Sequence, residues 1–151
     1  MKKFIALLLV LSILCSNQSM VTAKTRYEYD LRPTWRNVLW LAKCMYAENG
    51  HAQNDETVIL TGIVVCQRVR ARSYPSTIKG VISQRGQYST WRSGKIQSCE
   101  SDERCLELAE EILRFKIYKD YPHNLVFQSQ FPQGKMTYKY IKKDNEYFCL
   151  A

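Results

Sequence analysis

Glu48 is the residue of this sequence best placed to act as an acid. The apolar spacing before it predicts a helix that starts at Pro33-Thr34 and stops at Gly50, so Glu48 falls in its last turn. The helix dipole is negative there and disfavours a carboxylate, which suits a group that must hold its proton. The alternative is an ordinary solvated carboxylate near a helix end.

Residues 85–97 are predicted to form a loop that could work with this acid. The segment contains two glycines, Trp91 and several Gln, Tyr and Ser side chains. Loops of this kind often hold binding residues on a rigid scaffold. Aromatic rings stack on the apolar faces of sugars, and amides and hydroxyls bond sugar hydroxyls. The loop and Glu48 together could therefore form a sugar-binding cleft, to which Trp40 could add a further aromatic face.

Two predicted helices must position the acid. In the first, Trp35 belongs to the apolar stripe and is expected to be buried. In the second, Asn54 is a plausible cap, and residues 58–65 are apolar nearly all round, which predicts a central, buried helix. This second helix is expected to come out to solvent at Gln67, Arg68, Arg70 and Arg72.

The pattern changes from helical to extended along the rest of the chain. Ser76 can cap a short third helix, and a longer helix is expected over residues 101–116. Three short strands are then predicted over residues 125–127, 136–141 and 146–150, separated by turns at Pro132-Gln133-Gly134 and Asp144-Asn145. Helices first and a small antiparallel sheet last predict an α+β fold.

The first 23 residues have the features of a secretory signal peptide. Lys2 and Lys3 precede an apolar run over residues 4–14, and Val21-Thr22-Ala23 offers small residues for a signal peptidase. The apolar run is shorter than the roughly 20 residues that span a bilayer, although an uncleaved anchor is the alternative. We therefore expect an exported protein whose mature part, residues 24–151, is a single domain.

Charge and cysteine content limit the possible partners. The formal net charge of +8 becomes +6 without Lys2 and Lys3, which suits an anionic polymer such as the cell wall. The basic residues are scattered, so no nucleic-acid partner is expected. Cys99 and Cys105 bracket a polar loop that a disulfide could close. The sequence has no Cys-x-x-Cys pair and two histidines, so we expect no metal site.

Several short motifs follow one another in a distinctive order. They are Tyr46-Ala47-Glu48, Gln67-Arg68-Val69, Tyr74-Pro75, Thr77-Ile78, Val81-Ile82 and Gly86-Gln87-Tyr88-Ser89. In this order and spacing they resemble the spore cortex-lytic (SleB-type) family of cell-wall hydrolases. The resemblance is good over residues 41–89 and weaker from there to Tyr147-Phe148.

The resemblance implies a lysozyme- or lytic-transglycosylase-like helical core and cleavage of peptidoglycan between N-acetylmuramic acid and N-acetylglucosamine. It implies that Glu48 is the catalytic acid. In a lytic transglycosylase, such an acid protonates the leaving oxygen and then takes a proton from the muramic 6-hydroxyl, which gives a 1,6-anhydro product. One carboxyl suffices for this reaction, whereas most glycosidases use a pair. Burial and the helix end should raise its pKa.

The same resemblance suggests the walls of the cleft. Gln87, Tyr88 and Ser89 match the family's loop motif, although the motif could equally hold the loop's own backbone. Gln128, after a predicted strand, is a candidate for the opposite wall. The expected partner is a peptidoglycan glycan strand, bound by a monomer without cofactor and with no membrane contact beyond the signal peptide.

The sequence departs from the family's pattern directly after Glu48. The family often has Arg-Gly-Glu there, whereas this chain has Asn49-Gly50-His51-Ala52. The second Glu is therefore absent, and Asp55 or Glu56 is a candidate to replace it. Three functions stay open: a glycan-cleaving enzyme, a non-catalytic peptidoglycan-binding homologue, and an exported effector that acts on a competitor or host.

Overall fold

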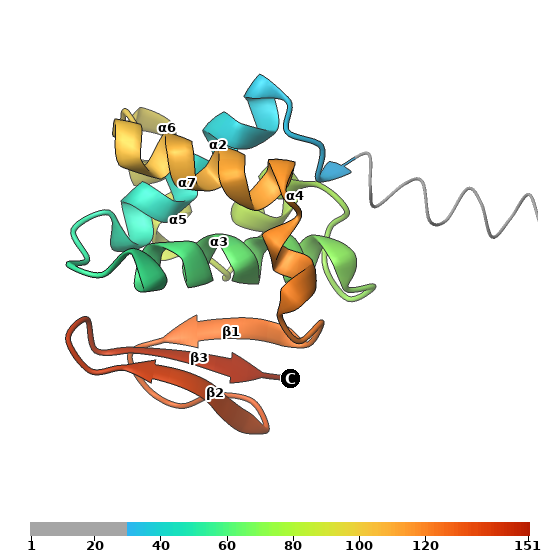
Figure 1. The fold of residues 1–151 in the computed structure, drawn as a ribbon, viewed down its shortest axis with the longest axis vertical. Helices are drawn as coiled ribbons and strands as arrows, with labels where there is room; N and C mark the ends of the chain where they lie inside the picture. Colours follow the sequence, from blue (N-terminus) through green and yellow to red (C-terminus); the bar gives the residue numbers. More distant parts are fainter. Residues whose placement is uncertain (1–29) are drawn as a thin grey trace, which may run out of the picture.

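The computed structural model describes residues 30–151, so the predicted signal peptide, residues 1–23, lies outside the described residues. A group of helices lies over a small sheet, and α3 runs between the other helices and the sheet (Figure 1). The helices are α2 (Trp35–Asn49), α3 (Asp55–Arg70), α4 (Ile78–Ser83), α5 (Ser89–Arg92), α6 (Lys95–Ser98), α7 (Glu103–Arg114) and the short 3-10 helix η1 (Ile117–Asp120). The strands are β1 (Leu125–Ser129), β2 (Met136–Ile141) and β3 (Glu146–Leu150). The predicted α+β fold is confirmed.

Helix α2 has the ends that the sequence predicts. The Thr34 side chain accepts a hydrogen bond from the Asn37 N–H at 3.3 Å, and Gly50 is the C-terminal cap. The prediction for Trp35 is wrong, because its side chain is 69% exposed. Trp35 lies in the first turn, where its ring borders an open groove between α2 and α7 that Leu106 also lines.

Helix α3 is buried along most of its length, as its apolar run predicts. The prediction of solvent exposure at Gln67, Arg68, Arg70 and Arg72 is wrong for the first two, since Gln67 is 0% exposed and Arg68 is 5% exposed. The Gln67 side-chain amide donates to the carbonyls of Tyr118 at 2.6 Å and Tyr121 at 3.1 Å. Arg68 Nε donates to the carbonyl of Val126 at 2.8 Å. These bonds attach α3 to η1 and β1 and give partners to the Gln67 amide nitrogen and to Arg68 Nε.

Residues 85–97 differ from the predicted loop. They contain the two single-turn helices α5 and α6, which Gly94 separates in a left-handed conformation with φ 81°. The cap of α4 is Thr77 rather than Ser76, and its hydroxyl accepts from the Gly80 N–H at 3.0 Å. Short polar segments that pack through few apolar side chains carry a weak periodic signal, which explains the wrong prediction.

The sheet is antiparallel and its order is β1-β3-β2, so β3 is the central strand although it follows both partners in the chain. The predicted strands are confirmed, and β1 extends two residues further than expected. Glu146 pairs with Ile141 on β2, and Phe148 pairs with Gln128 on β1. Side chains directly opposite each other share a face, so these four lie on the side that packs against α3.

All five cysteines of the described part are free thiols, so the bridge that the sequence allows between Cys99 and Cys105 does not form. Cys44, Cys66, Cys105 and Cys149 are buried, as is usual for free cysteines, while Cys99 is half-buried. Over residues 30–151, the structure contains no helix that is both long enough and apolar enough to cross a bilayer.

Candidate active site

Glu48 is the penultimate residue of α2 and is half-buried. The Thr90 hydroxyl, in the short helix α5, donates a hydrogen bond to Glu48 Oε1. Lys95 Nζ caps the end of α2 by donating to the Ala47 carbonyl at 2.5 Å. The carboxyl group is therefore held on one side by α5 and α6.

The pKa of Glu48 is raised above its ordinary value because burial disfavours the carboxylate. Three neighbours oppose this effect: the Thr90 hydroxyl, which bonds the charged form, and the positive charges of Lys95 and Arg68. Burial is the largest of these effects, so the carboxyl keeps its proton to a higher pH than an exposed glutamate does. That is the property required of a general acid.

A polar stripe on α3 forms the floor of the site. Thr57, Thr61 and Arg68 lie on one face of the helix, because they are four and then seven residues apart. Asn49, next to the acid, donates from Nδ2 to Thr61 Oγ1 at 2.9 Å. The Thr57 hydroxyl donates to the carboxylate of Asp144, in the turn between β2 and β3. The stripe thus connects the end of α2 to the sheet.

Arg68 lies between the 85–97 segment and β1. Its guanidinium carbon is 5.2 Å from the ring centre of Tyr88 and 5.4 Å from that of Tyr74. Its Nη1 is buried and has no hydrogen-bond partner among the described residues. Arg68 was expected in solvent, whereas in the structure it is a buried charge that acts on Glu48.

The structure separates the three predicted residues of the loop motif. Tyr88 is 7% exposed, and burial raises the pKa of its hydroxyl, which also feels the charges of Arg68 and Glu48. Gln87 and Ser89 are exposed, and no hydrogen bond joins either to Glu48. Thr90, the next residue, makes the contact instead. Thr90 directly follows the motif Gly86-Gln87-Tyr88-Ser89 in the chain, so the sequence could have indicated it as a site residue.

The sheet contributes two polar side chains to the opposite side. Gln128 on β1 and Glu146 on β3 are diagonal neighbours on the face that packs against α3. Gln128 Oε1 and Glu146 Oε2 are both buried without a hydrogen-bond partner in the described part of the chain. Burial and the charges of Glu48 and Asp144 raise the pKa of Glu146 to about 7. Glu146 alternates with Phe148 and Leu150, a pattern that could have shown an acid on the buried face.

Residues 52–148 match the family model described as Cell Wall Hydrolase, which covers more than half of the chain. The chain belongs to this family. The match confirms the resemblance found in the sequence. Searches of curated proteins and of solved structures found no match.

In this cell wall hydrolase, the matched segment begins at Ala52 and so leaves out Glu48. It includes Thr90, which donates a hydrogen bond to that acid, and Glu146, whose pKa the charge of Glu48 raises. The residues Asn49-Gly50-His51 also lie before the matched segment. They belong to the stretch that differs from the Arg-Gly-Glu expected from the resemblance.

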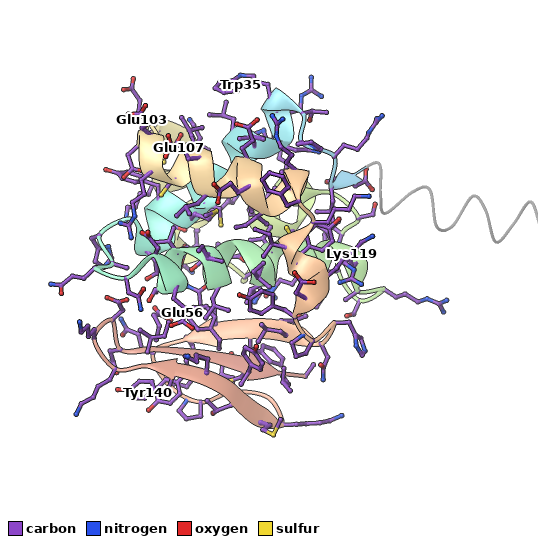
Figure 2. The ribbon with its side chains drawn as sticks, in the orientation of Figure 1. Trp35, Glu56, Glu103, Glu107, Lys119 and Tyr140 are labelled. Atoms are coloured by element: carbon purple, nitrogen blue, oxygen red, sulfur yellow. The ribbon has the colours of Figure 1, made fainter. Side chains whose placement is uncertain are left out.

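Asp55 and Glu56, the candidates to replace the missing second Glu, have other partners in this cell wall hydrolase. Arg104 Nη2 lies 2.6 Å from Asp55 Oδ1, and Lys139 Nζ lies 3.0 Å from Glu56 Oε1. Their side chains are 63% and 44% exposed. Figure 2 shows Glu56 between α3 and the sheet.

Two tryptophans extend the site along α2. Trp40 precedes Glu48 by two turns, and its ring centre is 5.8 Å from that of Trp91, the neighbour of Thr90. Both are half-buried, so each ring keeps an accessible part. Among residues 30–151, no group of three or more His, Cys, Asp and Glu side chains is arranged to hold a metal ion.

Proposed function

We propose that this cell wall hydrolase is a lytic transglycosylase that cleaves peptidoglycan between N-acetylmuramic acid and N-acetylglucosamine, with Glu48 as the general acid. The observation that carries the proposal is the half-buried Glu48 carboxyl, which has a raised pKa and an oxygen held by the Thr90 hydroxyl. Membership of the cell wall hydrolase family supplies the substrate class.

The proposed reaction begins with the protonated carboxyl of Glu48. It donates its proton to the oxygen that bridges the two sugars, and that oxygen leaves with the bonding electron pair. The muramic 6-hydroxyl then bonds to the anomeric carbon and loses its proton to the Glu48 carboxylate, which gives a 1,6-anhydro end. The sugar is its own nucleophile, so this reaction uses no metal and no cofactor.

The side chains around Glu48 provide surfaces for the sugars on either side of the cleaved bond. The pair of Trp40 and Trp91 is suited to stacking on a sugar face, and Gln128 offers an amide from the sheet. Gln87 and Ser89 are exposed and would contact a longer strand, whereas Tyr88 acts from a buried position. The net positive charge suits a cell-wall polymer, and we propose that the exported chain acts as a monomer.

The test is mass spectrometry of the fragments that the purified protein releases from peptidoglycan. Glu48→Gln keeps the shape of the side chain but removes its proton, so we expect the loss of at least about 100-fold in rate. Glu107→Gln is a matched control, because Glu107 is exposed and lies at the end of the molecule away from the sheet (Figure 2). Anhydro-muramic ends from the wild type and the control, but not from Glu48→Gln, would support the proposal.

Three other results would redirect the assignment. Reducing ends in place of anhydro ends would keep Glu48 as the acid and make water the nucleophile. Equal rates for Glu48→Gln and the wild type would remove Glu48 from the reaction. A wild type that sediments with peptidoglycan but releases no fragments would support the non-catalytic binding homologue.

A further inference from the structure

In the reaction proposed above, one carboxyl serves first as acid and then as base. The structure carries a second carboxyl on the other side of the same stretch of α3. We propose that Glu146 is the general base of this site and that Glu48 keeps the role of acid. This inference rests on the proposed function and assigns its second proton transfer to a residue of the sheet.

Two anchors bring the carboxyls to the same part of α3. Asn49, the neighbour of Glu48, is bonded to Thr61 at 2.9 Å, and Asp144, two residues before Glu146, is bonded to Thr57. Thr57 and Thr61 are one helical turn apart, and the Thr61 hydroxyl donates to the Thr57 carbonyl at 2.8 Å. The end of α2 and the start of β3 therefore lie over adjacent turns of one helix.

Burial distinguishes Glu146 from the other acids near the site. The residue is 9% exposed, and its Oε2 has no hydrogen-bond partner among residues 30–151. Asp144 is not equivalent, because its carboxylate accepts from the Thr57 hydroxyl and from the Gln53 N–H at 3.3 Å. A buried carboxyl oxygen without a partner costs free energy, which a purely structural role does not explain, and such uncompensated acids are typical of functional sites.

The charges around Glu146 suit this role near neutral pH. Glu48 on α2 and Asp144 in the β2–β3 turn both raise its pKa, in addition to burial, and the pKa is about 7. The charge of Glu48 acts on Glu146 only while Glu48 is ionised, so protonation of Glu48 lowers the pKa of Glu146 and favours its carboxylate. A base is most effective when its pKa is close to the pH at which it works.

The step can be written with all protons assigned. Glu48 transfers its proton to the bridging oxygen as the bond from that oxygen to the anomeric carbon breaks. Glu146, as a carboxylate, takes the proton of the attacking hydroxyl as its oxygen bonds to the same carbon. Glu48 is left as a carboxylate and Glu146 as a carboxylic acid, and exchange with solvent restores both. The hydroxyl is the muramic 6-hydroxyl in transglycosylation and water in hydrolysis.

The first test compares pH–rate profiles of fragment release for the wild type, Glu146→Gln, Glu146→Asp and the control Glu107→Gln. We expect the rate of Glu146→Gln to be about 100-fold lower than that of the wild type. Its profile should also lack the increase of rate with pH on the acidic side, because that increase reports the ionisation of the base. Glu146→Asp keeps a carboxyl and should be more active than Glu146→Gln. A Glu146→Gln variant with the rate and profile of the wild type would overturn the role of Glu146 and leave that of Glu48 untouched.

The second test does not depend on activity. Carboxyl carbon shifts of the full mature chain, followed by NMR against pH, give the pKa of Glu146 in the wild type and in Glu48→Gln. We expect a lower pKa in Glu48→Gln, because the charge of Glu48 raises it in the wild type. An unchanged pKa would overturn the pairing of the two carboxyls. Failure of the wild type to cleave any peptidoglycan would instead overturn the proposed function, and with it a catalytic role for Glu146.

Discussion

The proton on Glu48 is controlled by neighbours whose effects oppose one another. Burial raises the pKa of the carboxyl, and the Thr90 hydroxyl, Lys95 and Arg68 lower it. Each of these neighbours comes from a different helix or segment, so the balance depends on how α5, α6 and α3 pack around the end of α2. Substitutions at these positions should therefore alter the pH dependence of cleavage as well as its rate.

Thr90→Val tests this balance at a single side chain. Valine has nearly the same shape but cannot donate to Glu48 Oε1, so the pKa of Glu48 should rise. An acid with a higher pKa stays protonated to a higher pH. We expect the alkaline limb of the pH–rate profile to move to higher pH, with a loss of rate of about 10-fold because the carboxyl is held less firmly.

Thr90→Ser is the control for this prediction. Serine retains the hydroxyl, so its profile should follow that of the wild type. A valine variant whose alkaline limb stays in place or moves to lower pH would show that the Thr90 hydroxyl does not act on Glu48.

Single residues were predicted from the sequence only where a motif named them. Tyr46-Ala47-Glu48 pointed to Glu48 as the candidate acid, and Gly50 indicated the end of its helix. Arg68 was misjudged, because a charged residue at a helix end is usually solvated and its acceptor, the Val126 carbonyl, is distant in the chain. Glu146 was missed for a similar reason, since its relation to Glu48 arises from tertiary contacts.

At the scale of elements, α3 is the support on which both sides of the site are fixed. Its apolar faces pack against α2 and α7, and at Gly62 a Cβ atom would lie 2.8 Å from Ile112 Cδ1 and 2.9 Å from Met45 Sδ. Its polar positions reach η1 through Gln67 and β1 through Arg68. The sequence predicted the burial of this helix but not these polar attachments.

Gln67→Leu should destabilise the protein through these attachments. Leucine fills similar space, but it leaves the buried carbonyls of Tyr118 and Tyr121 without their donor. We expect the free energy of unfolding to fall by about 2 to 4 kcal/mol, as measured by urea denaturation. Gln53→Leu, in the exposed loop before α3, is the matched control and should change stability by less than about 0.5 kcal/mol. Equal stability of the two variants would contradict the role given to Gln67.

For the whole molecule, the buried carboxyls make stability depend on pH. The pKa of Glu146 rises from its ordinary 4.5 to about 7 on folding, and that of Glu48 also rises. A raised pKa in the folded state gives a contribution that is complete below the ordinary pKa and is lost as pH rises through the folded value. Wild-type stability should therefore fall, relative to Glu146→Gln, as pH increases from about 4.5 to above 7.

Urea denaturation of both proteins at pH 4.5 and pH 8 measures this difference. Each pKa unit corresponds to about 1.4 kcal/mol, so the change should be at most about 3 kcal/mol. A difference between the two proteins that stays constant with pH, or that grows in favour of the wild type at pH 8, would contradict the raised pKa of Glu146.

The fold class of the whole molecule was predictable because its signals are local. Helical spacing before residue 116 and alternation after residue 124 gave α+β directly. The turns at Gly134 and Asn145, both with positive φ, marked the limits of β2 and β3. The packing of the sheet against the helices was not predictable from the sequence. Strand order and the contact of β1 with α3 depend on pairings between distant segments.

The position of β3 in the sheet has a consequence for the time at which the site is completed. This strand lies between β1 and β2, yet both partners precede it in the chain, so neither can pair until it arrives. As the chain folds, the local contacts of the helix that carries Glu48 can form before the distant strand pairings that place Glu146. If Glu146 is the base, the capacity to cut the wall would appear at the final step of folding, once the central strand has joined the sheet.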